Sequence, residues 1–284
     1  MRRTLVPLIL WLLVPALAGD LLAQERKRAE GGGRMSPAHA DVKYGPHERN
    51  VMDVWLAESQ KPAPVLVSIH GGGFRGGNKS VSGELLRQCL AAGISVAAIT
   101  YRLTDAAIAP AQFHDGARAV QFLRSKAKEW NFDPKRFAAT GNSAGAGISL
   151  WLAFHEDLAD PESADPVLRE SSRLACVSVY NGQTTYDPRV IRKLRPDSGV
   201  FKIEPLVLLF GTGLDDPDRA PPEKLRLFEE VSAMPHLTKD DPPALLTYGQ
   251  PMDGKPDIHH PIFGKVLNEK MGALGIACNV IVKG

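Results

Sequence analysis

The stretch from Gly141 to Gly145, GNSAG, decides the fold because the sequence pattern changes from strand to helix across it. Residues 136–140 (RFAAT) predict a short buried strand, and residues 146–154 are small and apolar at helical spacing. A sharp turn between the two would hold Ser143 in a strained, exposed backbone conformation, and glycines beside it let strand and helix approach closely. This G-x-S-x-G pattern predicts that Ser143 is a nucleophile.

A second motif lies about seventy residues upstream, where the predicted strand 65–69 runs into HGGGF at residues 70–74. Attack by a serine on an acyl group places negative charge on the carbonyl oxygen, so backbone N–H groups must point at that oxygen. Glycines let the backbone come close enough to do so. We therefore expect an oxyanion hole formed by the N–H groups of Gly71, Gly72 and Ala144. Either motif alone could be an ordinary tight turn, but the two together favour acyl-transfer chemistry.

With these motifs the chain resembles the α/β-hydrolases of the esterase/lipase superfamily, close to the hormone-sensitive-lipase-like and feruloyl-esterase-like (BD-FAE) carboxylesterases. The resemblance runs from about Asp41 to the end of the sequence. It implies an α/β-hydrolase fold, which is a mostly parallel eight-stranded sheet with helices on both faces, and a Ser–His–Asp triad. The segments that carry it are YG (44–45), MDVW (52–55), HGGGF (70–74), YRL (101–103), FDPKR (132–136) and SAG (143–145).

Length and composition agree with one domain over residues 38–284. The chain has 284 residues, of which 44% are hydrophobic and 23% charged, as in an ordinary globular protein. Sheets of this type routinely use more than two hundred residues in a single domain. The formal net charge of +2 is too small to predict a nucleic-acid partner. No motif predicts a cofactor.

The N-terminus predicts a secretory signal peptide over residues 1–23. Met1-Arg2-Arg3 is basic, residues 5–17 are almost wholly apolar, and Ala16–Ala18 offers a small-x-small cleavage site, with Ala23 as a second one. The apolar run is too short for an ordinary spanning helix. We expect export to a periplasmic or extracellular compartment and no stable membrane insertion after cleavage, with an uncleaved anchor as the alternative. Residues 24–37 are predicted to be a flexible linker.

The rest of the chain alternates strand and helix patterns, which favours βαβ units and a parallel sheet. The polar segment 159–172 is expected to lie on the surface. The segment 184–235, rich in proline and charge, is expected to be irregular and to form a lid or cap over the site. Strands are predicted at residues 50–56, 65–69, 94–100, 137–140, 174–180, 244–248 and 276–282, and helices at 81–92, 113–130, 146–154 and 263–274.

The acid and the base of the triad are harder to assign. In this fold the order along the chain is Ser, then Asp or Glu, then His. Asp253, in the loop after the strand that ends at Tyr248, fits the acid best, and Asp257 is the alternative. The family's histidine usually follows the last strand, but no histidine follows residue 282 here. His259 and His260 precede the final helix, at a position that in the family packs against or caps that helix.

The segment between Asp253 and the final helix is short, so we expect that no histidine reaches Ser143, although His259 and His260 remain the candidate bases. Two hypotheses follow. The first is an exported serine esterase acting on small-molecule or polysaccharide-linked esters; the second is a catalytically impaired or truncated hydrolase fold with a binding role. A serine peptidase of the same fold is a weaker third alternative.

The other histidines and the cysteines are expected to be structural. His70 would support the glycine loop, while His114 and His155 would be surface or packing residues of helices. The three cysteines are expected to be buried free thiols. No spacing of residues predicts a metal site, since adjacent histidines such as 259 and 260 tend to point apart. The cysteines are Cys89, Cys176 and Cys278.

Overall fold

The computed structural model of the chain describes residues 35–196, 198–211, 216–252 and 255–284. The chain separates into residues 1–36 and residues 37–284, and the fold below is that of the second unit. The predicted signal peptide (1–23), most of the predicted linker (24–37) and Asp253 lie outside the described residues. None of the helices in the described part of the chain combines the length and apolar character needed to cross a bilayer.

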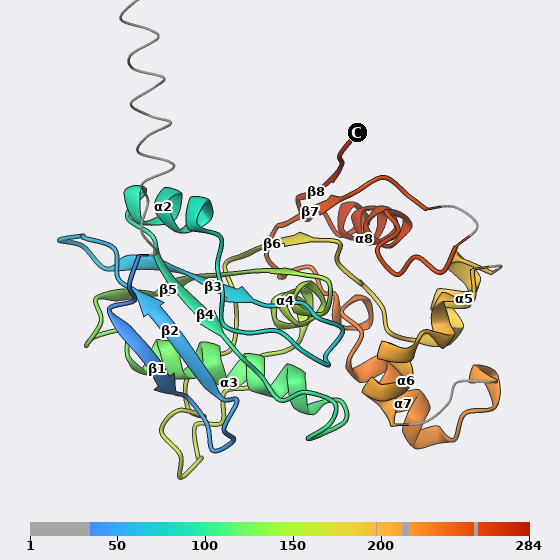
Figure 1. Cartoon of the computed structure of the whole chain (residues 1–284), viewed down its shortest axis with the longest axis horizontal. Coiled ribbons are helices and arrows are strands. Elements are labelled where there is room, and N and C mark those ends of the chain that lie inside the picture. Colours follow the sequence, from blue (N-terminus) through green and yellow to red (C-terminus); the bar gives the residue numbers. More distant parts are fainter. Residues whose placement is uncertain (1–34, 197, 212–215, 253–254) are drawn as a thin grey trace, which may run out of the picture. The chain divides into compact units, whose positions relative to one another are not determined.

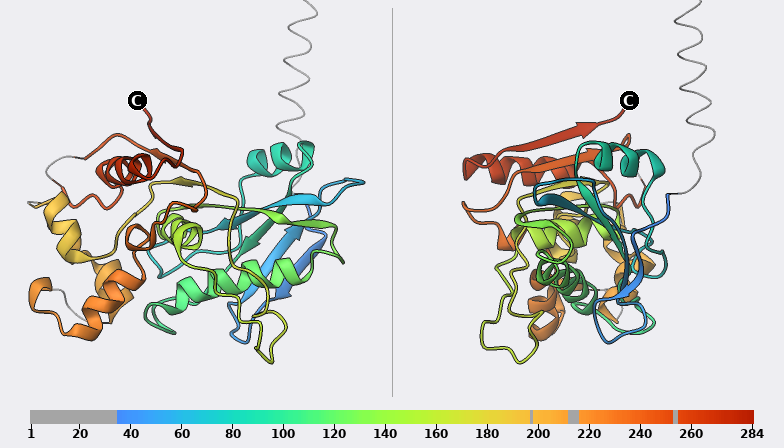
Figure 2. Two further views of the ribbon diagram at one scale, coloured as in Figure 1. Left: turned by 180° about the vertical axis from the view of Figure 1, so that it is seen from behind. Right: turned by 90° about the vertical axis from the view of Figure 1, so that its left-hand side faces the viewer.

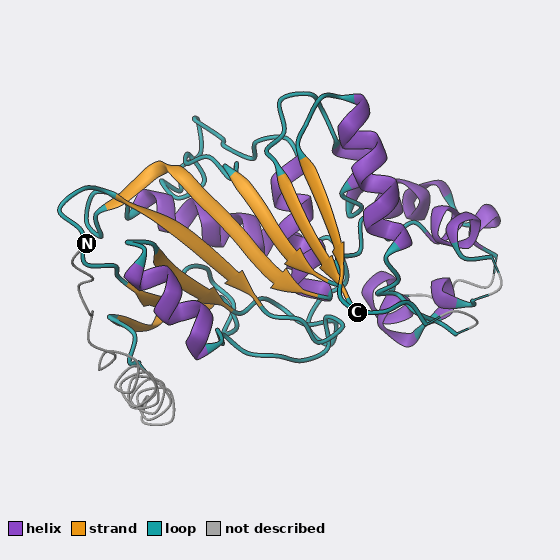
Figure 3. Ribbon diagram, turned by 90° about the horizontal axis from the view of Figure 1, so that it is seen from above, coloured by secondary structure: helices purple, strands orange, loops and turns teal. Residues whose placement is uncertain are grey.

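The described residues form an eight-stranded sheet, seen from above in Figure 3. Its strand order is β1-β2-β4-β3-β5-β6-β7-β8. The strands from β4 to β8 run parallel, and β1 and β2 are antiparallel to their neighbours. The predicted mostly parallel sheet is therefore confirmed. The strands are β1 (His39–Lys43), β2 (Val51–Trp55), β3 (Ala63–Ile69), β4 (Ser95–Ile99), β5 (Phe132–Asn142), β6 (Cys176–Tyr180), β7 (Ala244–Tyr248) and β8 (Cys278–Val282).

Helices cover both faces of this sheet, as expected (Figures 1 and 2). Helices α3 (Ala111–Ser125) and α4 (Ala144–Phe154) lie on one face, and α2 (Gly83–Ala91) and α8 (Ile262–Ala273) lie on the other. Strand β4 and helix α4 are buried along their whole length. Strands and helices covered on both sides need continuous apolar sequence rather than an alternating pattern. This is why the elbow helix carries almost no polar side chain.

The segment 184–235 is more regular than its sequence suggested. It contains α5 (Pro188–Leu194), α6 (Glu204–Phe210) and α7 (Pro222–Glu230), with three short 3-10 helices between or after them. Proline stands at the first or second position of each of these α-helices. Proline is favoured there because its missing N–H would have no intrahelical partner. Three of the prolines that suggested irregular structure are therefore at helix starts, and the helices lie toward the carboxyl ends of the central strands (Figure 3).

Three local expectations are corrected. The edge strand β1 was not predicted; Asp41 interrupts its pattern with a positive φ of 52°. The helix expected over 113–130 ends at Ser125, and turns lead from there into β5, which begins at Phe132 instead of residue 137. Cys176 is exposed rather than buried because it is the first residue of β6, whereas Cys89 is buried and Cys278 half-buried. All three cysteines are free thiols, as expected.

Candidate active site

Ser143 sits at a sharp turn between β5 and α4, half-buried, with φ 54° and ψ −120°. A positive φ is unfavourable for a residue with a Cβ, so the surrounding structure must hold it. One such contact is the hydrogen bond from the Ser143 N–H to the Tyr180 carbonyl oxygen (3.1 Å) at the end of β6. The close approach also explains Gly145, since a Cβ there would lie 2.1 Å from the Ile69 carbonyl oxygen. The strained turn predicted from the sequence is present.

His259 lies against Ser143, with 2.8 Å between the His259 Nε2 and the Ser143 Oγ. The expectation that the preceding segment is too short to bring a histidine to the serine is therefore wrong. The segment starts at the carboxyl end of β7, and β7 is the second neighbour of β5 in a parallel sheet. The carboxyl ends of parallel strands meet at one edge, so His259 has only a short distance to cover.

Asp257 is buried, at 3% exposure, two residues before His259. Its carboxylate accepts hydrogen bonds from the backbone N–H groups of His259 (2.9 Å) and Met252 (3.2 Å). These bonds hold the loop that carries His259. Burial lowers the pKa of His259 below its usual 6.5, and the negative charge of Asp257 opposes that shift. Asp253, the acid favoured by the sequence, lies outside the described residues.

His260 has a different role, at the start of α8. Its Nδ1 accepts a hydrogen bond from the backbone N–H of Ile262 (3.1 Å), the first residue of α8. A side chain that accepts from the first turn of a helix satisfies an N–H that has no intrahelical partner. The structure therefore brings one of the two candidate histidines to Ser143 and uses the other at the start of the helix.

The glycine loop and Ser143 line the same cavity. Gly72 (φ 107°) and Gly73 (φ 60°) adopt positive φ values, and both line the cavity that Ser143 opens into. Ala144 lines the same cavity and is the first residue of α4, so its N–H has no partner within the helix. Gly71 lies behind them, against the elbow backbone, where a Cβ would be 2.6 Å from the Asn142 carbonyl oxygen. Gly73 faces the cavity and was not singled out in the sequence.

His70 supports this loop, as its position suggested. Its Nδ1–H donates to the Gly71 carbonyl oxygen (2.7 Å), and its ring stacks on Tyr101 with 4.3 Å between ring centroids. Arg49 donates to the other ring nitrogen, His70 Nε2 (3.3 Å). Burial lowers the pKa of His70 to about 4, so this imidazole stays neutral at physiological pH. A neutral ring is the form that can donate from Nδ1 and accept at Nε2.

A cavity of about 340 Å³ opens in front of Ser143. This is at the lower end of the range for small-molecule sites. The N-terminal end of α6 lines one side, and an ion pair between Arg75 and Glu204 stands where the glycine loop meets α6. The apolar wall is formed by Phe74, Tyr186, Ile203, Pro205, Leu206 and Ile258.

Gln183 was missed by the sequence reading. It is buried and lines the cavity, and its Nε2 donates to the carbonyl oxygens of Asn181 (2.8 Å) and Ile258 (3.4 Å). Its Oε1 accepts from the Tyr186 hydroxyl (3.1 Å). Gln183 therefore joins the end of β6 to the residue before His259. No sequence signal could have found it, since a lone glutamine in a loop has no motif.

The sequence model of the BD-FAE family matches residues 52–253, which include the glycine loop and the serine turn. Esterase LipC of Mycobacterium tuberculosis is 25% identical over 230 residues, covering 73% of this chain and 49% of that protein. Probable carboxylic ester hydrolase LipM of the same organism is 27% identical over 216 residues, covering 74% of this chain and 47% of that protein. The chain thus spans about half the length of these two relatives.

Among solved structures, a truncated carbohydrate esterase from gut microbiota superposes with a TM-score of 0.68 at 21% identity, covering 87% of this chain and 90% of that one. At this low sequence identity, the structural similarity is evidence for the fold alone. Together with the strand order and the helices on both faces, it confirms the α/β-hydrolase fold predicted from the sequence.

Proposed function

The chain belongs to the BD-FAE family of α/β-hydrolase-fold carboxylesterases, and from this premise we propose that it is an exported serine hydrolase that cleaves carboxylic esters. The observation that carries the proposal is the 2.8 Å contact between the His259 Nε2 and the Ser143 Oγ. A serine hydroxyl attacks an ester only when a base takes its proton, and a base within hydrogen-bond reach meets that need. The same contact argues against a catalytically impaired fold with only a binding role.

In the proposed reaction, the Ser143 Oγ attacks the ester carbonyl carbon while His259 Nε2 takes the hydroxyl proton. The carbonyl oxygen becomes negative and is held by the N–H groups of Ala144 and the glycine loop. The C–O bond to the alcohol then breaks, and the alcohol leaves with the proton from His259. Water then attacks the acyl-enzyme while His259 takes a proton from it. His259 returns this proton to the Ser143 Oγ as the bond between Ser143 and the acyl group breaks, so that the carboxylic acid leaves and the Ser143 hydroxyl is restored.

Labelling with a small fluorophosphonate tests this proposal. Ser143 should displace fluoride and gain one phosphonyl group, because the reagent's phosphoryl oxygen occupies the place of the developing oxyanion. Mass spectrometry of tryptic peptides should locate a single adduct on the peptide that contains Ser143. An adduct on another residue, or a wild-type protein that stays unlabelled, would show that the proposal is wrong.

Asp257 is the acid we assign to this site, in place of the Asp253 favoured by the sequence. Its buried carboxylate lies on the loop of His259, and its charge raises the pKa of that imidazole, which means that it stabilises the protonated ring formed during attack. Asp257→Asn should lower kcat by about 10²–10⁴-fold; an Asp-to-Asn change at a triad acid costs up to about 10⁴-fold. It should also move the acidic limb of the pH profile to lower pH, since the opposing charge is gone.

Asp253→Asn is the paired variant for this assignment. We expect it to lower kcat less than Asp257→Asn does, because the buried Asp257 carboxylate already binds the backbone of His259. A larger loss for Asp253→Asn than for Asp257→Asn in steady-state ester hydrolysis would return the role of the acid to Asp253.

The substrate proposed is a small-molecule ester or an ester of a polysaccharide side chain. Apolar walls around about 340 Å³ suit a compact acyl group. The Arg75–Glu204 pair offers polar contacts to the alcohol part. The carbohydrate esterase among the structural relatives is consistent with a sugar-linked alcohol.

Export is proposed from the basic, then apolar, then small-residue pattern of the first 23 residues. When the full chain is expressed in a secreting bacterium, intact-mass measurement should find a mature N-terminus at Gly19 or Gln24. Recovery of the chain in the membrane fraction with Met1 still present would identify the apolar run as an anchor.

A further inference from the structure

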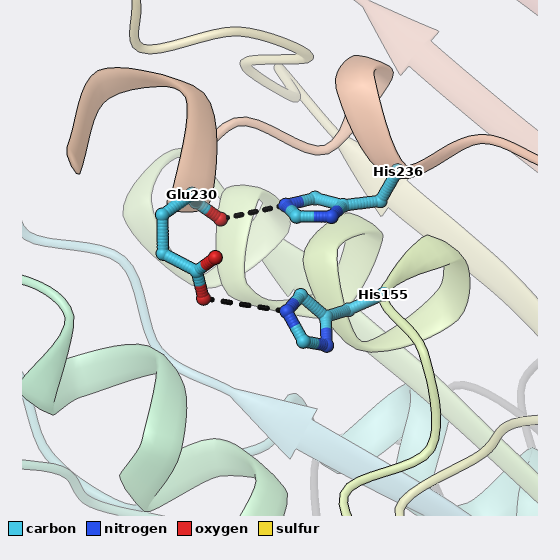
Figure 4. A group of neighbouring side chains, drawn as sticks. All are labelled: His155, Glu230 and His236. Carbon is cyan, nitrogen blue, oxygen red and sulfur yellow. Dashed lines mark hydrogen bonds and ion pairs between the residues drawn. The ribbon is translucent and has the colours of Figure 1, made fainter. Parts of the chain in front are cut away.

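Two histidines and a glutamate meet where the 3-10 helix Met234–His236 contacts α4 (Figure 4). His155 directly follows α4, Glu230 is the last residue of α7, and His236 ends the short 3-10 helix Met234–His236. One ligand atom from each side chain lies within 4.8 Å of the other two. His155 is buried, and Glu230 and His236 are half-buried. None of the three lines the cavity at Ser143.

We propose that His155, Glu230 and His236 form a binding site for a divalent transition-metal ion of the Zn²⁺ type. Two imidazoles and one carboxylate are ligands that Zn²⁺ prefers, and three protein ligands leave the fourth tetrahedral position to water. The Glu230 side chain is 37% exposed, so an ion can enter and a water can reach that fourth position.

The hydrogen bonds of His155 favour this assignment. Its Nδ1 lies 3.0 Å from the Glu156 carbonyl oxygen, which can only accept, so Nδ1 carries a proton there. Its Nε2 faces another acceptor, the Glu230 Oε1, at 3.3 Å. A proton on Nε2, donated to the carboxylate, satisfies this contact, and a metal ion bound to Nε2 would take the place of that proton. A carbonyl that holds the second nitrogen is also the usual outer support of a metal-binding histidine.

Metal binding would require only small movements of the three side chains. With metal–ligand distances near 2.0–2.1 Å, two ligand atoms of a tetrahedral zinc site lie roughly 3.3 Å apart. The His155–Glu230 pair already has that separation, at 3.3 Å. The third ligand atom, within 4.8 Å of the others, has to move by little more than an ångström. That is within the reach of a rotation of a half-buried side chain on a short 3-10 helix.

His236 gives up one hydrogen bond when it binds. Its Nε2 now donates to the backbone carbonyl oxygen of Glu230 (2.8 Å). Binding through Nε2 replaces that hydrogen bond with the metal bond and shifts the proton to Nδ1. The carbonyl oxygen does not lose its only partner, because the Trp151 Nε1–H also donates to it (2.7 Å). The exchange therefore leaves no buried acceptor unsatisfied.

A metal here would join two parts of the fold. Glu230 and His236 lie at the end of α7 and on the 3-10 helix that follows it. His155 directly follows α4, the helix that begins after Ser143. An ion that binds only the folded chain stabilises it by mass action. At a zinc concentration one hundred times Kd, the melting temperature should rise by roughly 5–10 °C for a chain of this size.

Isothermal titration of the metal-free, untagged chain with zinc chloride at pH 7.5 tests the site. We expect one zinc ion per chain. His236→Gln and Glu230→Gln should each weaken binding by more than about tenfold and remove the rise in melting temperature. Both side chains are half-buried, and circular dichroism without zinc will show whether the variants are folded. His47→Gln, a histidine substitution away from the cluster, should bind like the wild type.

The active-site histidines are the competing place for zinc. His259→Ala should keep the stoichiometry and affinity of the wild type if the proposed cluster is the site. Absence of zinc binding by the wild type overturns the proposal. Binding that survives in both His236→Gln and Glu230→Gln but is lost in His259→Ala overturns it as well, and places the ion at the active site. Neither result would depend on whether the chain hydrolyses esters.

Discussion

Replacing Ser143 with alanine should lower kcat for an activated ester such as 4-nitrophenyl acetate by about 10⁴–10⁶-fold. Removing the nucleophile of a serine triad costs about 2 × 10⁶ in kcat in a well-studied protease, and the oxyanion hole and substrate binding still give about 10³–10⁴ over water. KM should change little, because the Oγ contributes little to holding the ground-state ester. Initial-rate measurements with active-site-titrated wild type as reference provide the test.

Ser149→Ala is the matched control for this substitution. Ser149 lies in α4, which directly follows Ser143, and its hydroxyl donates to the Gly145 carbonyl oxygen (2.7 Å), so its loss perturbs this helix without removing the nucleophile. We expect kcat within about threefold of the wild type and a small loss of stability, about 1 kcal/mol for one hydrogen bond. Equal activity of Ser143→Ala and the wild type would exclude Ser143 as the nucleophile.

The sequence predicted the parts of this molecule that depend on local pattern. The predicted geometry of the serine turn is confirmed. It depends on a local steric requirement that glycine at position 145 meets, since a Cβ at that position would lie 2.1 Å from the Ile69 carbonyl oxygen. The apolar residues that follow it are likewise required locally. The buried strands follow for a similar reason, since continuous apolar runs are required wherever a parallel strand is covered on both faces. Such requirements are met by a few residues that are close together in the sequence, so the sequence pattern reveals them.

What the sequence did not predict depends on contacts between distant segments. His259 comes within 2.8 Å of Ser143, 116 positions earlier, because β7 lies two strands from β5 in the sheet. A search for metal ligands closely spaced in the sequence could not join His155 to Glu230, because the two residues lie far apart along the chain. Neither pairing has a local signature. The first follows from the strand order, and the second from the contact of the 3-10 helix Met234–His236 with α4.

His259→Ala should lower kcat by about 10⁴–10⁶-fold, whereas His260→Ala should leave it within a few-fold of the wild type. The first substitution removes the base 2.8 Å from the Ser143 Oγ, and triad bases and nucleophiles act as one unit, so losing either costs a similar factor. The second removes a side-chain acceptor for the Ile262 N–H at the start of α8. That loss should appear as about 1 kcal/mol in urea unfolding, the usual contribution of one hydrogen bond.

The pH dependence of the wild type supplies the second half of this test. His259 acts as a base only when neutral, and neutral imidazole predominates above its pKa. Burial lowers the pKa of His259 from 6.5, so kcat/KM should be level near pH 7–8 and fall as pH drops through a value below 6.5. His260→Ala should keep this limb unchanged. If instead the limb disappears in His260→Ala, or if His259→Ala hydrolyses the ester like the wild type, the base is not His259, and the contact with Ser143 would have only a structural role.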